Sequence, residues 1–218
     1  MHPYSDFLFC KNNFFKNPNT VLALADSLKY SVTSESFPGV RTENIATSNN
    51  SMCMNFANSF IESLVTQIYK DIVSMTIDIR FHRYPLYSQT INDPFNQGWV
   101  HTDHELLAGV CYLNKEIANF SAGTSFYTPK TSCIPNIAAI REDFNKNLPV
   151  DQNIYANAVT SHNSLFEKTL TIGNMYNRLV TYDSKIFHKP DNFYIGNSEV
   201  RTILLFVISE YVCRNNNE

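Results

Sequence analysis

The sequence predicts a mainly β protein, an antiparallel jelly roll with helices on its N-terminal side. Three features of the pattern lead to this prediction. Helical periodicity is found within about the first 75 residues, a two-residue alternation begins near residue 76, and the later apolar runs are short and separated by turn-forming residues. Short strands joined by turns build sandwiches and barrels, and helices can cover an exposed sheet face.

Two helices are expected in the N-terminal region. Pro18 suits the first turn of a helix that Asn17 would cap, with apolar residues at helical spacing over 21–28. A Pro-Gly pair predicts a turn within 37–42. A longer helix is predicted over about 52–73. Its apolar residues recur every four positions: Phe56, Phe60, Leu64, Ile68 and Ile72.

Strands are expected from about Thr76 onward, since apolar and polar residues alternate over 77–81. Further strand candidates are short apolar runs bounded by polar or turn-forming residues: 99–101, 107–113, 124–127, 178–182 and 200–209. The stretch 131–172 is expected to be an insertion. It contains a candidate short helix near 136–145 and a candidate strand near 167–172.

The length and composition indicate one globular domain. The chain has 218 residues, of which 44% are hydrophobic and 17% charged, so there is enough apolar material for a core. We predict a single domain over 1–218, in which 1–75 is a helical support and 76–209 is the β core. The segments 85–98 and 131–166 are candidate substrate lids, because long loops on a rigid barrel commonly carry specificity.

Charge and cysteine usage bear on partners and compartment. A formal net charge of −3, from 17 basic and 20 acidic residues, argues against a dedicated nucleic-acid binder. No apolar stretch approaches the length of a transmembrane helix, and the first residues do not resemble an ordinary secretory signal. The five cysteines are scattered and form no CxxC pair, which is typical of a reducing cytosol. We therefore expect a cytoplasmic protein with no membrane partner.

His101, Asp103 and His188 are the most informative side chains. His101 and Asp103 stand at i and i+2, so both project from one face of an extended strand. His188, which follows a second strand-like segment, is the candidate third ligand. Two imidazoles and one carboxylate leave the opposite face of an octahedral Fe(II) ion open for a bidentate cosubstrate and oxygen. A structural zinc would need a fourth protein ligand, usually sulfur.

Arg201 stands near the start of the apolar run 200–209, and this position suggests a specific role. A buried guanidinium needs an anionic partner, and a carboxylate matches it through two parallel hydrogen bonds. One dicarboxylate could therefore satisfy both groups. It would chelate a metal held by the two histidines and the aspartate at one end, and meet Arg201 at the other.

The order of these residues resembles that of the Fe(II)/2-oxoglutarate-dependent oxygenases. The pattern consists of an HxD triplet, a glycine-threonine motif, a distal histidine and a following arginine: His101-x-Asp103, Gly123-Thr124-x-Phe126, His188 and Arg201. The framing segments 109–114, 121–127 and 177–184 are also similar. The resemblance covers about 76–209 and is closest to the prolyl-hydroxylase-like branch of bacteria and phages. The N-terminal part is similar to poorly characterised members from marine microbes and their viruses, which for a viral protein implies the host cytoplasm.

The resemblance implies a double-stranded β-helix, a jelly roll of the cupin-like type, with Fe(II) and 2-oxoglutarate as cofactors. His101, Asp103 and His188 would hold the iron, and Arg201 would bind the distal carboxylate of 2-oxoglutarate. Tyr84 is a secondary candidate for a bond to 2-oxoglutarate, because related enzymes often carry a tyrosine on the strand before the metal motif. The implied reaction consumes O2, releases succinate and CO2, and hydroxylates an aliphatic C–H, with ascorbate in a supporting role. The presence of Asp103 favours hydroxylation over halogenation.

Two other functions are compatible with this fold. One is a non-catalytic jelly-roll binding module, such as a cupin-like sensor or a viral structural protein, and the other is an enzyme that uses another metal without 2-oxoglutarate. Arg201 argues against both, since neither needs a buried guanidinium. The substrate stays open among a free amino acid, a peptide side chain and a small metabolite, and the sequence does not define an oligomeric state.

Overall fold

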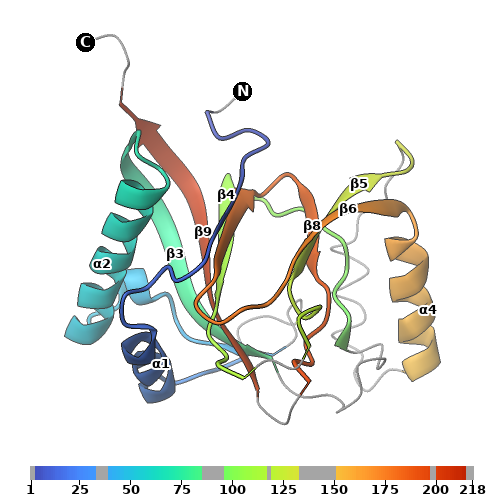
Figure 1. The fold of residues 1–218 in the computed structure, drawn as a ribbon, viewed down its shortest axis with the longest axis horizontal. Helices are drawn as coiled ribbons and strands as arrows, with labels where there is room; N and C mark the ends of the chain where they lie inside the picture. The colour runs from blue at the N-terminus through green and yellow to red at the C-terminus, as the bar shows by residue number, and fades with distance from the viewer. Residues whose placement is uncertain are drawn as a thin grey trace.

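The computed structural model describes residues 3–32, 39–84, 96–116, 119–132, 151–196 and 200–214. In these ranges the chain forms a larger antiparallel sheet in the order β1-β7-β4-β9-β3-β2 and a smaller one in the order β6-β5-β8 (Figure 1). The elements in chain order are β1 Leu8–Lys11, α1 Pro18–Ser27, β2 Val40–Arg41, the 3-10 helix η1 Ile45–Thr47, α2 Ser51–Gln67, β3 Ile72–Tyr84, β4 Leu107–Tyr112, β5 Thr124–Pro129, α4 Gln152–Asn163, β6 Phe166–Ile172, β7 Leu179–Asp183, β8 Phe187–Pro190 and β9 Arg201–Cys213. The predicted mainly β jelly roll is confirmed.

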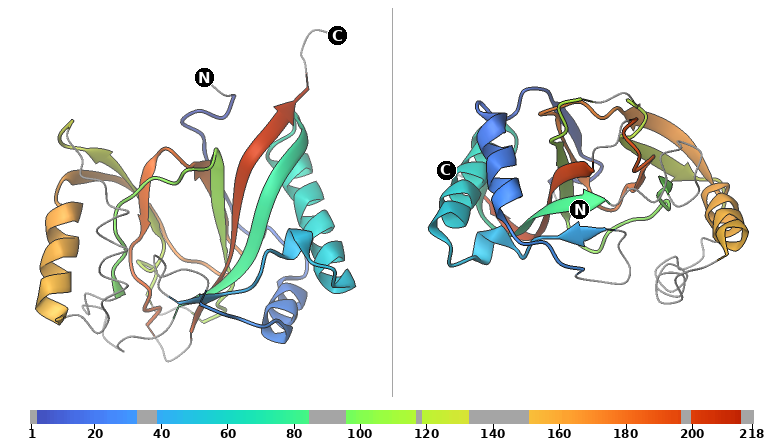
Figure 2. Two further views of the ribbon diagram at one scale, coloured as in Figure 1. Left: turned by 180° about the vertical axis from the view of Figure 1, so that it is seen from behind. Right: turned by 90° about the horizontal axis from the view of Figure 1, so that it is seen from below.

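Two buried clusters lie on opposite faces of the larger sheet. Helices α1 and α2 cover the outer face (Figure 2), where Phe60 and Leu64 of α2 pack against β3 and β9. The inner face and the smaller sheet share the second cluster: Tyr84, Ala108, Val110, Tyr112, Phe126, Val180, Tyr182, Phe193 and Ile203. Alternate residues of a strand point to opposite faces, which is why Cys111 joins the outer cluster and Tyr112 the inner one.

Helix α1 begins at Pro18, as predicted, and buries Val21 and Ala25. Asn17 occupies the N-cap position, but its side chain makes no capping hydrogen bond, so that part of the prediction is wrong. The carbonyl of Asn17 instead accepts hydrogen bonds from the backbone N–H and the hydroxyl of Thr20. The proline and the buried apolar face therefore define the start of this helix.

The helix predicted over 52–73 is too long at its C-terminal end. Helix α2 ends at Gln67, and Ile72 opens strand β3. Ile68 leaves helical geometry with φ at −130°, and Tyr69 then turns into the core, where it is fully buried. Ile72 fits the four-residue repeat and also pairs with β9, so periodicity alone assigns it to the wrong element.

Five predicted strands correspond, in chain order, to β4, β5, β6, β7 and β9: 107–113, 124–127, 167–172, 178–182 and 200–209. The strand predicted from Thr76 is β3, which starts at Ile72. The strand predicted at 99–101 is wrong, because in this segment only His101 forms a bridge, an isolated one with His188.

Several elements are missing from the prediction. Strand β1 lies in the region predicted as a helical support, yet it pairs with β7 in the larger sheet. Strand β8 has only four residues, and helix α4 lies within the predicted insertion. The helix predicted near 136–145 and residues 85–95 of a candidate lid lie outside the described residues. Among the helices that are described, none has the length and apolar character needed to cross a membrane.

Candidate metal centre

His101 and His188 are brought together by a single pair of backbone hydrogen bonds. The N–H of His101 donates to the carbonyl of His188 at 2.9 Å, and the N–H of His188 donates to the carbonyl of His101 at 2.8 Å. His188 belongs to β8 and pairs with Phe126 of β5, whereas His101 stands in irregular backbone. One edge of the smaller sheet therefore sets the separation of the two imidazoles.

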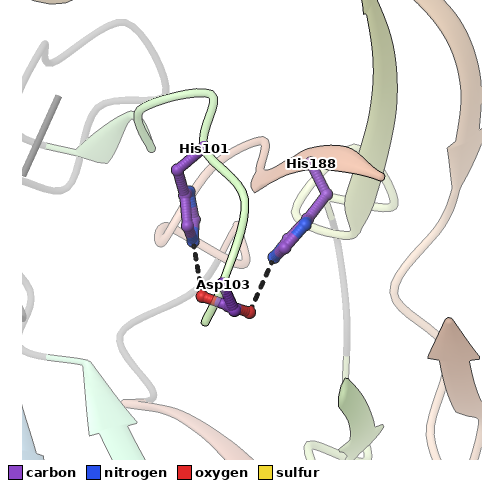
Figure 3. Close-up of side chains that lie close together, drawn as sticks. All are labelled: His101, Asp103 and His188. Atoms are coloured by element: carbon purple, nitrogen blue, oxygen red, sulfur yellow. Dashed lines mark ion pairs between the residues drawn. The ribbon is translucent and has the colours of Figure 1, made fainter. Parts of the chain in front are cut away.

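Both imidazoles are oriented by the carbonyl of the residue two positions earlier in the chain. Nδ1 of His101 lies 2.7 Å from the carbonyl oxygen of Trp99, and Nδ1 of His188 lies 2.8 Å from that of Ile186. A carbonyl oxygen can only accept, so each Nδ1 carries the proton. The lone pair of each Nε2 is left to face the same point (Figure 3).

Asp103 completes the group. Its two carboxylate oxygens lie 3.6 Å from Nε2 of His101 and 3.3 Å from Nε2 of His188. All three ligand atoms lie within 4.8 Å of one another. Metal–ligand bonds of about 2.0–2.2 Å place neighbouring ligand atoms about 3 Å apart, so a small inward movement would close the three ligands around one ion.

The electrostatics of the group favour a cation at its centre. With the proton on Nδ1, a neutral imidazole presents a lone pair to the carboxylate of Asp103 rather than a donor. Three electron-rich atoms that face one another repel unless the imidazoles take up protons or a cation sits between them. His188 is 3% exposed, so water screens this repulsion poorly there.

The turn between β7 and β8 holds the backbone of Asp103. The N–H of Asp103 donates to the carbonyl of Ser184 at 3.0 Å. The ammonium group of Lys185 donates to the carbonyls of Asp103 and His104, both at 3.0 Å. The imidazole of His104 is exposed and stands outside the group. His101 is thus anchored by strand β8, and Asp103 by the turn that precedes this strand.

Arg201 is buried in the inner cluster and is 1% exposed. Its guanidinium lies over the ring of Tyr84 at 4.9 Å and near the ring of Tyr112 at 5.7 Å. In the described part of the chain, Nε and Nη1 of Arg201 have no hydrogen-bond partner and no carboxylate forms a salt bridge with it. Such a buried cation is costly, and an anionic ligand would offset the cost.

Tyr112 and Thr124 add two hydroxyl groups to this region, and the sequence prediction did not assign them a role. The hydroxyls of Tyr112 and Thr124 are 2.7 Å apart and buried. Burial raises the pKa of Tyr112 to about 12, although the positive charge of Arg201 acts in the opposite direction. Two signals could have found them: Tyr112 shares the inner face of β4 with Ala108 and Val110, and Thr124 lies within the glycine-threonine motif.

Tyr84 stands directly opposite Arg201 in the register of β3 and β9. Its ring stacks on Phe193 at a centroid distance of 4.4 Å and lies 4.2 Å from the ring of His82. The structure therefore brings Tyr84 to Arg201 through its ring. Its predicted bond to 2-oxoglutarate stays a prediction.

Tyr182 connects the two parts of the site. Its ring lies 4.6 Å from the imidazole of His188 and 5.1 Å from the ring of Phe126. Burial raises the pKa of Tyr182 well above its usual value, and the negative charge of Asp103 and the phenol of Tyr112 act in the same direction. The histidine–aspartate group and the surroundings of Arg201 thus belong to one interior.

Solved structures show what this fold is similar to. The structure of HygX from Streptomyces hygroscopicus with nickel and 2-oxoglutarate bound has a TM-score of 0.56 and 10% identity, covering 94% of this chain and 83% of that chain. The non-heme alpha ketoglutarate dependent epimerase SnoN from nogalamycin biosynthesis has a TM-score of 0.53 and 9% identity, covering 98% and 83%. A prolyl-4-hydroxylase from Pseudomonas putida has a TM-score of 0.49 and 11% identity, covering 97% and 95%.

At these identities the comparison with HygX and SnoN shows a shared fold, and the predicted double-stranded β-helix is confirmed. No curated protein matches the sequence. The model of one sequence family, described as Family of unknown function (DUF6445), matches residues 7–192. The chain therefore belongs to this family.

Proposed function

We propose that this chain is an Fe(II)- and 2-oxoglutarate-dependent oxygenase that hydroxylates an aliphatic C–H. The observation that carries the proposal is a pairing of two unsatisfied groups in one interior. Two imidazole lone pairs and a carboxylate converge on one point, and the buried guanidinium of Arg201 has two nitrogens without a hydrogen-bond partner among the described residues. A metal chelated by a dicarboxylate supplies the missing charge at both places.

In this proposal each side chain has a distinct task. Nε2 of His101, Nε2 of His188 and one oxygen of Asp103 hold the iron, while each Nδ1–H donates to a backbone carbonyl. Bound iron would activate O2 and couple its reduction to the conversion of 2-oxoglutarate into succinate and CO2. Tyr182 and Phe126 pack beside His188 and exclude water from this side of the site.

Arg201 would bind the distal carboxylate of 2-oxoglutarate through Nε and Nη1, which have no partner in the part of the chain that the structure describes. The phenol of Tyr112 keeps its proton, because its pKa is raised to about 12, and so it can donate a further hydrogen bond to the same carboxylate. Tyr84 closes the other side of the guanidinium with its ring. Aromatic rings and a fixed arginine together would select a flat anionic group of this size.

The substrate class is an amino acid, a peptide side chain or a small metabolite. The folds that resemble this one do not share one reaction, since SnoN is an epimerase and SnoK a carbocyclase. Hydroxylation is proposed because Asp103 occupies the third ligand position, so no protein ligand is missing there. We place the chain in the prolyl-hydroxylase-like branch on its motif order, with O2 as the second cosubstrate and ascorbate as a supporting reductant.

The test begins without oxygen. Fe(II) and 2-oxoglutarate added anaerobically should produce a weak visible charge-transfer band, and admission of air should release succinate. The variant His101→Ala should lose the band, whereas His104→Ala, which removes an exposed neighbouring imidazole, should keep it. A protein that gives neither the band nor succinate is not an oxygenase of this class. Succinate release coupled to candidate substrates would then identify the substrate.

A further inference from the structure

We propose that Asn163, at the C-terminal end of α4, is a positioning residue that holds His101 in the metal centre. The proposal rests on the proposed function. His101 stands in an irregular segment, 98–101, that belongs to neither sheet. Helix α4 lies beyond the smaller sheet, at the opposite end of the molecule from α2 (Figure 1). It supplies the hydrogen bonds that this segment would otherwise make to a neighbouring strand.

The side-chain amide of Asn163 bonds one backbone carbonyl and one backbone N–H of this segment, as a neighbouring strand would. Its Nδ2 donates to the carbonyl of Gly98 at 3.1 Å, and its Oδ1 accepts from the N–H of Val100 at 2.9 Å. An amide is one of few side chains that can donate and accept at the same time. A single residue therefore satisfies backbone groups on both sides of Trp99, in a segment that is largely buried.

Two further side chains of α4 also form hydrogen bonds to the segment 98–101. Nε2 of His162 lies 2.7 Å from the carbonyl oxygen of Val100, and the indole N–H of Trp99 donates to the hydroxyl of Tyr155 at 3.2 Å. The other side of the segment is closed by β8. A Cβ on Gly98 would lie 2.3 Å from the carbonyl oxygen of Pro190, so the backbone there fits closely between the strand and the helix.

The link to the metal ligand runs through the carbonyl of Trp99. This carbonyl accepts from Nδ1 of His101 at 2.7 Å, and it lies between the two backbone groups that Asn163 bonds. Loss of the Asn163 amide would free the carbonyl to rotate, and the imidazole would lose its fixed proton position and direction. Groups that bond a ligating histidine typically contribute about 10–100-fold to metal affinity, and Asn163 acts through such a group, the carbonyl of Trp99.

The test compares three variants of the whole protein with Co(II) as the probe under anaerobic conditions. Asn163→Leu removes both hydrogen bonds at similar volume, and we expect at least a tenfold weaker Co(II) affinity and an altered visible absorption spectrum. Asn157→Leu makes the same change at an exposed position of α4 and should leave affinity and spectrum unchanged. Asn163→Asp keeps the acceptor for Val100 and should recover part of the lost affinity. Equal Co(II) affinity in Asn163→Leu and the wild type overturns the proposal.

A second measurement needs no metal and guards against a variant that is merely less stable. Hydrogen exchange in the metal-free protein should be faster in Asn163→Leu at the amides of Val100 and His101, with no change along β4. Unchanged exchange at these two amides also overturns the proposal. If the wild type binds no Co(II), the proposed function fails, and the exchange rates alone then decide whether Asn163 holds His101.

Discussion

The two halves of the candidate site call for ligands of opposite charge. In the metal centre, each ring N–H is already bonded to a backbone carbonyl, and the three ligand atoms face one another. Around Arg201 the backbone is regular, because the residue sits in a paired strand, but two guanidinium nitrogens have no partner among the described residues. The ligand atoms of the metal centre therefore repel one another unless a cation binds. The guanidinium of Arg201 is held in place but has no carboxylate partner within the described ranges.

This difference indicates how the two ligands should act on the protein. The metal centre has its side-chain directions fixed in advance by backbone hydrogen bonds, so binding requires little ordering. The guanidinium is held by the rings of Tyr84 and Tyr112, which tolerate a cation but do not neutralise it. An anion that reaches Arg201 should therefore stabilise the folded chain as well as be bound by it.

The largest expected effect breaks the metal centre. Asp103→Ala removes the carboxylate that lies 3.3 Å from His188 and 3.6 Å from His101, and it should abolish iron-dependent succinate release. Metal affinity should fall by more than about 100-fold, since loss of even an outer partner commonly costs about 10–100-fold. Metal titration with and without 2-oxoglutarate measures this loss. Turnover by Asp103→Ala at the wild-type level would remove Asp103 from the metal centre.

The next largest effect concerns Arg201. Its replacement should weaken 2-oxoglutarate binding without destabilising the ligand-free protein. Arg201→Met replaces a buried cation by an apolar side chain of similar volume. The binding free energy of 2-oxoglutarate should become less favourable by about 2–5 kcal/mol, the usual cost of losing one partner of a buried charge pair. The ligand-free variant should be as stable as the wild type or about 1–4 kcal/mol more stable, because an unpaired buried charge is removed.

Calorimetric titration and chemical unfolding check these two results. Arg80→Met is the matched control, since the guanidinium of Arg80 is already paired with Asp78 and lies outside the site. It should leave 2-oxoglutarate affinity unchanged. Equal 2-oxoglutarate affinity in wild type and Arg201→Met would refute the assigned role of Arg201.

A smaller effect comes from a single hydroxyl group. Tyr112→Phe removes the phenol that lies 2.7 Å from Thr124, and 2-oxoglutarate affinity should fall about tenfold, as for a hydrogen bond to a charged group. Tyr69→Phe is the matched control. Tyr69 is also a buried tyrosine bonded to a threonine hydroxyl, but it lies in the outer cluster. Both variants should lose stability, and only Tyr112→Phe should lose affinity for 2-oxoglutarate.

The sequence was sufficient where one pattern dominates a segment. Alternation predicts β3, and short apolar runs predict β4, β5, β7 and β9, because a strand buried on one or both faces leaves that mark. Prediction from the sequence fails where contacts between distant segments determine the element to which a residue belongs. Ile72 belongs to β3 only because β9 pairs with it, and α4 has no strong apolar stripe, so nothing local indicates that its side chains hold the segment before His101.

The site divides in the same way. The triad and Arg201 could be predicted as candidates, since their residue types suit a metal ion and a carboxylate, and the structure brings the three triad residues together. The strand face of Tyr112 and the motif around Thr124 are weak signals, and a role follows only from the structure, which places the ring of Tyr112 beside Arg201 and its hydroxyl beside that of Thr124. Asn163 is further removed still, since it acts through the backbone of another segment.

The smallest expected effect concerns pH and tests the state of the Tyr112 phenol. Burial raises its pKa to about 12, above the value near 10 of an exposed tyrosine, so the unfolded chain loses this proton first. The stability that the neutral phenol contributes is therefore complete below about pH 10 and is lost as the pH rises toward 12. The ratio of 2-oxoglutarate affinities between the wild type and Tyr112→Phe should accordingly stay constant from about pH 7 to pH 9. Using the ratio cancels every titration that the two proteins share, including those of the metal centre. A ratio that falls toward one across this range would mean that the phenol ionises beside Arg201 and repels the carboxylate it is expected to bind.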